Sequence, residues 1–362
     1  MSHQTIRAGI IGLSWIAADR AGLASDPLLG SAPPYSHASA MEAVGGIEVV
    51  AACDLKEEAR TSFRETWAHM WPDIELFDDA GRLLESDIDL VSIVTPDHMH
   101  ADLIEQALSA GVPMIFTEKP FTTSLDDADR LLRRINDAGA SVSVNHTWRW
   151  RPDVLEARRL VHDGDLGSLS LVTIEAGGPR AMLFRNLSHF LDLAIFLANG
   201  VPEWVMGELE PGYADYGTEY SGDGGTDPER DPGAWAVIGF DNGARAFVGG
   251  MKSGPADVSI QVQGSEGRVT IDPLGARVIE NPRTSDGTPG SVSGPAIRPL
   301  RPRHTQSGMT AGLADLIQSH REGRRPSSSA HGARHTVAVI DAILRSNLSS
   351  SREEGKPFPN GG

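Results

Sequence analysis

Short apolar runs alternate with helical patterns through the first 120 or so residues, and this alternation constrains the fold more than any other feature. The runs lie at Ile6–Ile11, Ile47–Cys53, Leu90–Thr95 and Val112–Thr117. Buried runs separated by helices are typical of parallel strands joined by right-handed crossovers. The first part of the chain is therefore predicted to be an open parallel sheet, which binds ligands at the carboxyl ends of its strands.

The first predicted strand turns at Gly12 directly into a helical pattern over Ile16–Leu23. A dinucleotide-binding turn needs glycine first for the turn, glycine second for close approach to the pyrophosphate, and a small third residue for packing. Here Ser14 stands second and Ala17 third, and a serine hydroxyl can itself donate to a phosphate. An ordinary strand-to-helix turn is the alternative. The residues assigned to the cofactor in this turn are Gly12, Ser14, Trp15 and Ile16.

The second predicted strand ends at Asp54. A carboxylate at this place accepts hydrogen bonds from the adenosine ribose hydroxyls and repels a 2′-phosphate, which favours NAD over NADP. The spacing from Gly12 is longer than usual, and we interpret Ser25–Ala40 as an inserted loop. In the alternative interpretation, Asp54 only caps a helix that begins near Lys56.

The run Val112–Thr117 leads into Glu118, Lys119 and Pro120. This order places Lys119 at the carboxyl end of a buried strand, where the following proline restricts the backbone. A lysine held there can titrate, donate to a substrate oxygen or lie beside a nicotinamide ring.

The order of strand, Thr95-Pro96, His100, helix, strand and Glu118-Lys119-Pro120 is distinctive, and Ser188–Asp192 opens a later helix. This pattern resembles the glucose-fructose oxidoreductase / inositol dehydrogenase / MocA family of NAD(P)-dependent oxidoreductases, over nearly the whole chain. The resemblance implies an α/β protein, with an N-terminal Rossmann dinucleotide-binding domain (1–122) followed by an α+β domain with a large, mainly antiparallel open sheet (123–362). By position, it assigns Thr95, Pro96, His100, Glu118, Lys119 and Pro120 to the cofactor, and Lys119 and His189 to catalysis.

The second half of the chain carries apolar segments at hairpin-like spacing between residues 168 and 272, which predicts the antiparallel sheet. Two long polar stretches, Pro211–Gly233 and Asn281–His304, are interpreted as mobile loops, either lids or disordered. Helices are expected mainly on one side of this sheet. A homodimer or homotetramer that covers the other side is therefore predicted, as the resemblance also implies.

Lys119 and His189 are expected to act as a coupled pair that takes the proton of a substrate hydroxyl. The family usually has an aspartate four residues before this histidine, whereas this chain has Arg185. A guanidinium cannot act as a base but can hold a carboxylate or a pair of polyol oxygens, so Arg185 points to an altered or acidic substrate. The substrate-binding candidates are Asn145, Arg149, Arg180, Arg185 and Asp192. For each of these arginines alone, a surface position is the alternative.

Composition excludes several other classes of protein. The net charge of −17 disfavours a nucleic-acid reader, and the single cysteine, Cys53, excludes an internal disulfide. No run reaches bilayer length, and the first residues do not resemble a signal peptide, so we expect no membrane partner and a cytoplasmic location. His98 and His100 suggest a metal site only weakly, because no further ligand cluster has suitable spacing, and none is predicted.

The sequence therefore predicts an NAD(P)-dependent oxidoreductase that transfers a hydride between nicotinamide and a secondary alcohol of a sugar, cyclitol or sugar acid. NAD is favoured as the cofactor. A non-catalytic regulatory or scaffold protein of the same fold is the alternative, motivated by Ser14 and Arg185. Redox-assisted elimination of a glycoside, with internal cofactor recycling, is a third possibility.

Overall fold

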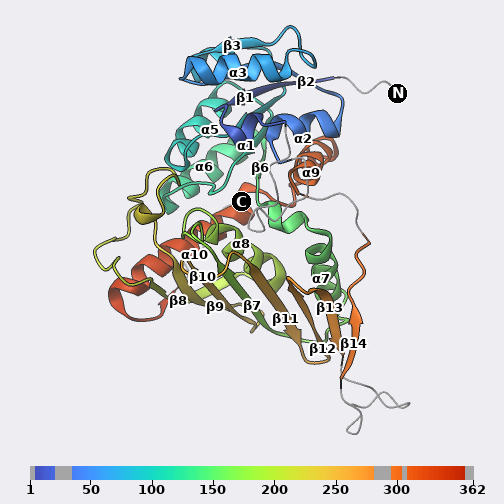
Figure 1. Ribbon diagram of the computed structural model, residues 1–362, viewed down its shortest axis with the longest axis vertical. Helices are drawn as coiled ribbons and strands as arrows, with labels where there is room; N and C mark the ends of the chain where they lie inside the picture. The colour runs from blue at the N-terminus through green and yellow to red at the C-terminus, as the bar shows by residue number, and fades with distance from the viewer. Residues whose placement is uncertain (1–4, 21–34, 281–294, 304–307, 355–362) are drawn as a thin grey trace.

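Two sheets organise the molecule, one parallel and one mainly antiparallel, and they are stacked along its long axis (Figure 1). The computed structural model describes residues 5–20, 35–280, 295–303 and 308–354. The parallel sheet comes from the N-terminal part of the chain, and the antiparallel sheet from the C-terminal part. Both predicted layers are confirmed.

The parallel sheet has six strands in the order β3-β2-β1-β4-β5-β6, which is the arrangement of a doubly wound nucleotide-binding sheet. The central strands of this sheet are buried, because helices cover both of its faces. Its strands are β1 (Ile6–Ile11), β2 (Ile47–Cys53), β3 (Glu75–Phe77), β4 (Leu90–Ile93), β5 (Met114–Thr117) and β6 (Ser141–Val144). The sheet thus continues past the predicted domain boundary at residue 122, since β6 belongs to it.

Two groups of helices pack against this sheet. On one face, Leu131 and Ile104 pack with Ile115 of β5, and on the other, Trp67 and Leu316 pack in a cluster with Ile10 of β1. The first group comprises α4 (Ala80–Leu84), α5 (His100–Ser109), α6 (Leu125–Ala138) and the first turns of α10 (Ala330–Ser349), and the second comprises α2 (His37–Val44), α3 (Glu57–Trp67) and α9 (Gly308–Glu322). The C-terminal helices α9 and α10 therefore stabilise the N-terminal sheet.

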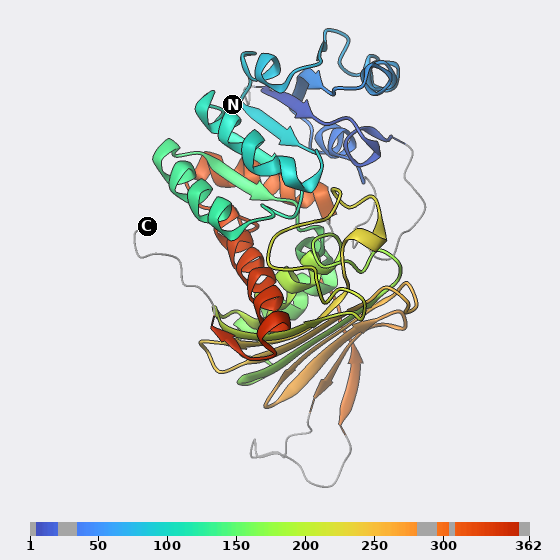
Figure 2. The same cartoon turned by 90° about the vertical axis from the view of Figure 1, so that its left-hand side faces the viewer.

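The second sheet has nine strands in the order β14-β13-β12-β11-β7-β10-β9-β8-β15, and all its neighbours are antiparallel except β7 and β10. Its strands are β7 (Leu169–Gly177), β8 (Pro202–Leu209), β9 (Ala234–Phe240), β10 (Arg245–Met251), β11 (Val258–Gly264), β12 (Gly267–Asp272), β13 (Gly275–Glu280), β14 (Ala296–Pro299) and β15 (Glu353–Glu354). The helices α7 (Pro152–His162), α8 (Leu187–Ala198) and α10 lie on one face, as Figure 2 shows. Phe190 and Ile343 pack there against Ile238 of β9.

Within the described part of the chain, no helix covers the opposite face of this sheet (Figure 2). Large apolar side chains are exposed there, among them Met206, Trp235, Phe247 and Met251, each between 39% and 47% accessible. They line a groove of about 830 Å³. This face is available to a partner of matching shape.

The structure corrects three predictions of local structure. The helix expected over Ile16–Leu23 is only the short α1 (Trp15–Ala18), with an extended Asp19 after it, and residues 21–34 lie outside the described part. The interpretation of Ser25–Ala40 as a loop is wrong at its end, because α2 begins at His37 after Ser36, whose side chain accepts from Ser39 N. Similarly, β14 lies within the Asn281–His304 stretch, of which 281–294 and His304 are outside the described residues.

Candidate active site

A cavity of about 880 Å³ lies at the carboxyl ends of β1, β4 and β5, between the parallel sheet and the start of α8. It is lined by residues of both halves of the chain. Among the residues that the sequence predicts for the site, it brings together Gly12, Ser14, Trp15, Ile16, Asp54, Thr95, Pro96, Glu118, Lys119, Asn145, Arg180, Arg185 and His189. The sequence also predicts His100, Pro120, Arg149 and Asp192, which do not line the cavity.

Gly12 forms the turn between β1 and α1 with a positive φ of 87°. A Cβ atom at this position would lie 2.5 Å from the carbonyl oxygen of Val94, so only glycine fits. The adjoining Trp15 and Ile16 begin α1, and the first backbone N–H groups of a helix have no partner within it. The turn therefore leaves space and donors for an anionic group.

The Asp54 carboxylate is fixed beside this turn. Its Oδ2 accepts a 2.8 Å hydrogen bond from the backbone N of Leu13, and its Oδ1 accepts one of 2.9 Å from Lys56 N. The hydrogen bond from Lys56 N agrees with the alternative interpretation, in which Asp54 caps a helix. The N-cap residue of α3, however, is Lys56 itself. Asp54 thus orders the start of α3 and also lines the cavity.

Glu118 is held by a buried network that the sequence did not reveal. Its Oε1 accepts a 2.6 Å hydrogen bond from Asn145 Nδ2 and lies 3.1 Å from Nε2 of His37, which is fully buried in α2. His37 Nδ1 lies 2.5 Å from Ser92 Oγ, so the tautomer protonated at Nε2 donates to Glu118 and accepts from Ser92. Burial opposes ionisation of Glu118, but the hydrogen bonds from His37 and Asn145 help to outweigh it and hold the pKa of Glu118 below its usual range.

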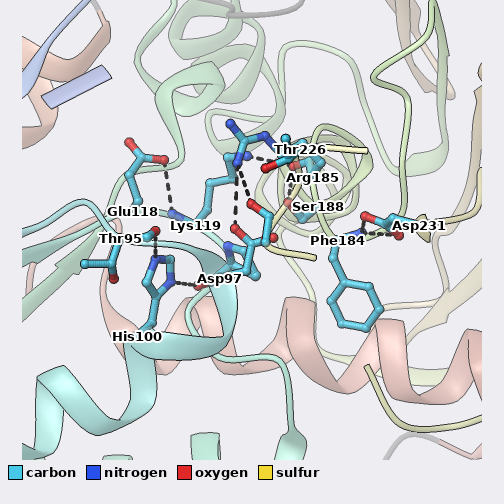
Figure 3. A network of polar contacts seen from close by, with 12 residues as sticks. Thr95, Asp97, His100, Glu118, Lys119, Phe184, Arg185, Ser188, Thr226 and Asp231 are labelled. Carbon is cyan, nitrogen blue, oxygen red and sulfur yellow. Dashed lines mark hydrogen bonds and ion pairs between the residues drawn. The ribbon is translucent and has the colours of Figure 1, made fainter. Parts of the chain in front are cut away.

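Lys119 points from the end of β5 toward the start of α8 (Figure 3). Its Nζ donates a 2.9 Å hydrogen bond to the carbonyl oxygen of Arg185. Burial and, next, the nearby Arg185 charge lower the pKa of Lys119 from 10.5 to about 7. At neutral pH a large fraction of this side chain is therefore an uncharged amine, which can accept a proton.

His189 lies in the first turn of α8 and lines the same cavity as Lys119. Its Nδ1 is buried and has no hydrogen-bond partner among the described residues. Burial and then the Lys119 charge lower the pKa of His189 well below 6.5, so the ring is neutral at physiological pH. A neutral imidazole offers one donor and one acceptor.

Asp192 and Arg149 lie behind the cavity and form a buried ion pair. Arg149 donates from Nε to Oδ2 and from Nη2 to Oδ1 of Asp192, both at 2.6 Å, and Thr336 Oγ1 donates to Oδ1 at 3.3 Å. His146 Nδ1 is 3.1 Å from the same Oδ1, and the His146 ring meets the His189 ring edge-on at 6.1 Å. Burial would raise the pKa of Asp192, but Arg149 and His146 together lower it. Arg149 and Asp192 satisfy one another, and His146, whose Nδ1 makes no hydrogen bond among the described residues, lies between them and the ring that lines the cavity.

His100 and Pro120 connect the Thr95-Pro96 turn after β4 to the Glu118-Lys119-Pro120 segment after β5. The His100 ring is fully buried, with Nδ1 2.6 Å from Pro120 O and Nε2 3.0 Å from Thr95 O (Figure 3). This imidazole bridges the turn after β4 to the segment that carries Lys119. Its neighbours Thr95 and Pro96 line the cavity, whereas His100 itself does not.

The segment Pro211–Gly233, interpreted from the sequence as a mobile loop, forms one wall of the cavity. Lys252 Nζ donates hydrogen bonds to Tyr213 Oη at 2.8 Å and to Pro228 O at 2.7 Å, and also pairs with Glu210. The Asp231 carboxylate accepts from the backbone N of Phe184 at 3.1 Å, and burial raises the pKa of Asp231 to about 8. These contacts place Gly224, Gly225, Thr226 and Pro228 on the cavity surface.

Several buried polar atoms of the cavity lining have no hydrogen-bond partner among the described residues. They are Thr95 Oγ1, Asp97 Oδ2, Asn145 Oδ1 and His189 Nδ1. Unpartnered buried polar atoms are costly, and four of them around one cavity indicate that a polar ligand completes their hydrogen bonds. Asp97 was not predicted from the sequence as a site residue, although it directly follows Thr95-Pro96.

Other kinds of site receive no support in the described ranges. No three His, Cys, Asp or Glu side chains there are grouped to hold a metal ion, and no helix there is long and apolar enough to cross a membrane. Cys53 is buried at the end of β2, and burial raises the pKa of its thiol to about 11. Trp148 is a core residue that packs on Phe190.

A doubly wound sheet with a cavity at its carboxyl edge, closed by a helix of a second α/β unit, defines a two-domain dinucleotide-binding oxidoreductase. Residues 6–146 match the family model for the NAD-binding Rossmann fold of the oxidoreductase family, and residues 175–353 match its C-terminal alpha/beta domain. The chain belongs to this glucose-fructose oxidoreductase / inositol dehydrogenase / MocA family.

Individual relatives agree with this assignment. The scyllo-inositol 2-dehydrogenase (NAD(+)) of Bacillus subtilis is 27% identical over 295 residues, which are 76% of this chain and 75% of that enzyme. The D-apiose dehydrogenase of Paraburkholderia graminis is 30% identical over 182 residues, 46% of this chain and 47% of that enzyme. An Agrobacterium radiobacter oxidoreductase, solved in complex with NAD+, L-tartaric acid and magnesium, shares the fold with a TM-score of 0.73 and 18% identity, covering 97% of this chain and 98% of that one.

Proposed function

We propose that the protein is an NAD-dependent dehydrogenase that oxidises a secondary alcohol of a sugar, cyclitol or sugar acid, or reduces the corresponding ketone. The observation that supports this most is that Lys119 and His189 line one cavity together with Gly12 and Asp54. A hydride transfer needs the cofactor, a proton acceptor and the alcohol in one place. The relatives named as inositol and apiose dehydrogenases support the substrate class.

The bound nicotinamide would accept or supply the hydride, and the side chains of this chain would handle the proton. Lys119, with a pKa of about 7, is matched to take the hydroxyl proton at neutral pH. Its hydrogen bond to Arg185 O fixes the amine, so the remaining nitrogen valences can meet the substrate. Neutral His189 would orient the same hydroxyl by a hydrogen bond. Asn145, Arg180 and Arg185 are proposed to bind the other substrate oxygens.

Arg149 and Asp192 are proposed to act on the reaction only through position, since their charged groups pair with each other and not with the cavity. They fix α8 and the His146 ring, against which His189 lies. His100 and Pro120 are likewise proposed to hold the cofactor turn and Lys119 in register.

NAD is proposed over NADP because the Asp54 carboxylate lies at the cavity, fixed by Leu13 N. A 2′-phosphate would meet its negative charge. Titration with NADH and NADPH should show tighter binding of NADH, and Asp54→Asn should reduce the difference. Equal binding of both cofactors by the unchanged protein would contradict this part of the proposal.

The function is tested by incubating the protein and NAD+ with a panel of polyols, cyclitols and sugar acids, and following NADH at 340 nm. At least one compound should give NADH formation that depends on Lys119. The alternative, a regulatory protein, would bind NADH without turning over any compound. Elimination of a glycoside would instead release sugar without net NADH.

We also propose that the protein forms a homodimer or homotetramer through the uncovered face of the nine-stranded sheet. Exposed Trp235 and Phe247 on that face are the basis. Light scattering should give a multiple of 38.7 kDa, and Phe247→Glu should lower it. A monomer at micromolar concentration would contradict the assembly without affecting the catalytic proposal.

A further inference from the structure

Three basic side chains line the cavity near the proposed reaction centre, namely Lys119, Arg180 and Arg185. Both arginines are close enough to Lys119 to lower its pKa by their charge. Two carboxylates, Asp97 and Glu118, line the same region. Glu118 already accepts from Asn145 and lies beside His37, whereas the Arg185 guanidinium makes fewer contacts.

The Arg185 guanidinium has donors to spare within the described part of the chain. Its Nη1 makes one long hydrogen bond, 3.5 Å to Gly224 O, and lies 3.7 Å from Asp97 Oδ1. A guanidinium has five N–H donors in a planar fork, so most of them remain for a ligand. The side chain is 21% exposed, and this exposed part belongs to the cavity lining.

The glycine pair of the cavity wall fixes where this guanidinium lies. Gly224 and Gly225 both have positive φ, 87° and 84°. A Cβ on Gly225 would come within 2.6 Å of Arg185 Cδ and 2.8 Å of Nη1, so the backbone packs directly on the arginine. Asp97 lies beside the guanidinium, as Figure 3 shows, and has a buried Oδ2 without a partner. Arg185 is thus held at the cavity by contacts that leave its fork largely unsatisfied.

Resting on the proposed function, we propose that the substrate is a polyhydroxy carboxylate whose carboxylate group is bound by Arg185, while one of its secondary hydroxyls lies at Lys119 and His189. A carboxylate matches the planar fork and forms two charge-assisted hydrogen bonds with it. A neutral polyol would offer the donors of Arg185 only uncharged acceptors, with which hydrogen bonds are weaker.

The test compares acids with the alcohols in which each carboxylate is replaced by a hydroxymethyl group. D-Gluconate is paired with D-glucitol, and L-tartrate with L-threitol, with sodium chloride added to the alcohol samples to match the salt. Binding to the NADH-saturated protein is measured by calorimetry, which does not depend on turnover. At least one acid should bind tenfold or more tightly than its alcohol, a difference of the size expected for one charge-assisted pair.

Variants then assign the preference to one side chain. Arg185→Gln should weaken acid binding by about 10- to 100-fold and Arg185→Lys by less, because lysine keeps the charge but not the fork. Arg298→Gln removes an exposed arginine of β14, paired with Glu280 at the far end of the other sheet, and should leave the acid preference intact. NADH binding by each variant shows whether it is folded.

Equal binding of acids and alcohols by the unchanged protein would overturn the inference, as would an Arg185→Gln variant that weakens both by the same factor. The proposed function is judged separately by NADH formation. If polyols are oxidised without an acid preference, the function stands and the inference fails. If acids bind through Arg185 but no compound yields NADH, the anion site stands and the dehydrogenase proposal fails.

Discussion

Lys119 Nζ donates a 2.9 Å hydrogen bond to the backbone oxygen of Arg185, four residues before His189. The same oxygen accepts from Ser188 Oγ at 2.7 Å. This contact joins the end of β5 in the parallel sheet to the start of α8 in the second unit. It brings together two candidate catalytic side chains that are 70 positions apart in the sequence.

Replacing Lys119 by alanine should reduce turnover while NADH binding persists. A positioned proton acceptor contributes about 10²- to 10⁴-fold to the rate, so kcat should fall by that factor. Lys119→Arg should be nearly as inactive, because guanidinium does not titrate near pH 7. NADH formation and a separate NADH titration measure the two effects. Activity within twofold of the unchanged protein would remove Lys119 from the mechanism.

Alcohol oxidation should depend on pH through the Lys119 amine. Its pKa is lowered from 10.5 to about 7, so the amine is protonated below pH 7 and free to accept a proton above it. The value of kcat/KM for oxidation should therefore rise about tenfold per pH unit below 7 and level off above it. The profile between pH 5.5 and 9 measures this. A profile that falls over this range would contradict a neutral amine as the acceptor.

Replacing His37 by alanine should destabilise the protein by about 1–3 kcal/mol, because Glu118 loses a buried partner. The loss should be smaller at low pH. The pKa of Glu118 is lowered in the folded state, so the stability it contributes is fully present above its ordinary pKa of 4.5 and is lost gradually as the pH falls from 4.5 toward the lowered folded-state pKa. Urea unfolding at pH 7 and pH 3 measures both effects.

The matched control for this variant is His98→Ala, which removes an exposed histidine from the turn between β4 and α5. It should change the free energy of unfolding by no more than about 0.5 kcal/mol. If the two variants are equally stable at pH 7, the contact between His37 and Glu118 contributes nothing measurable.

Asp192→Asn should be strongly destabilising, since it leaves the Arg149 guanidinium buried without its counter-charge. Removing one partner of a buried pair costs about 3–5 kcal/mol. Asp78→Asn, which breaks an exposed pair with Arg82, should cost at most about 1 kcal/mol. Unfolding in urea at pH 7 compares the two. If Asp192→Asn is as stable as the unchanged protein and only its KM is raised, Asp192 binds the substrate directly and the positioning role is wrong.

The sequence predicted the parts of the site that depend on strand ends and short motifs. Gly12, Thr95 and Lys119 each follow a strand whose apolar run is plain in the sequence, and the topology of a doubly wound sheet brings them to one edge. His189 and Arg185 came from resemblance, and the structure places both on the same cavity. Most strand positions were predictable for the same reason, that buried runs are short and bounded by turn residues.

The contacts among buried polar side chains were not predictable. His37 reaches Glu118 across 81 positions, and nothing in the local sequence of α2 marks that histidine as a partner. Asp192 was expected near substrate because it shares a helix with His189, but its carboxylate meets Arg149 instead. The wall Pro211–Gly233 has the composition of a mobile loop, and its contact with Lys252, which lies in a later segment, has no local signal. Such pairings are set by tertiary packing and leave no periodic signal.

The central claim is that Lys119 and His189 serve one bound nicotinamide. A crystal structure of the protein with NAD+ tests it most directly. The claim predicts that the nicotinamide ring lies in the cavity with Lys119 Nζ and the His189 ring both facing its C4 atom, and with the pyrophosphate at Gly12. A nicotinamide bound elsewhere, or one that contacts only one of these two side chains, would contradict it.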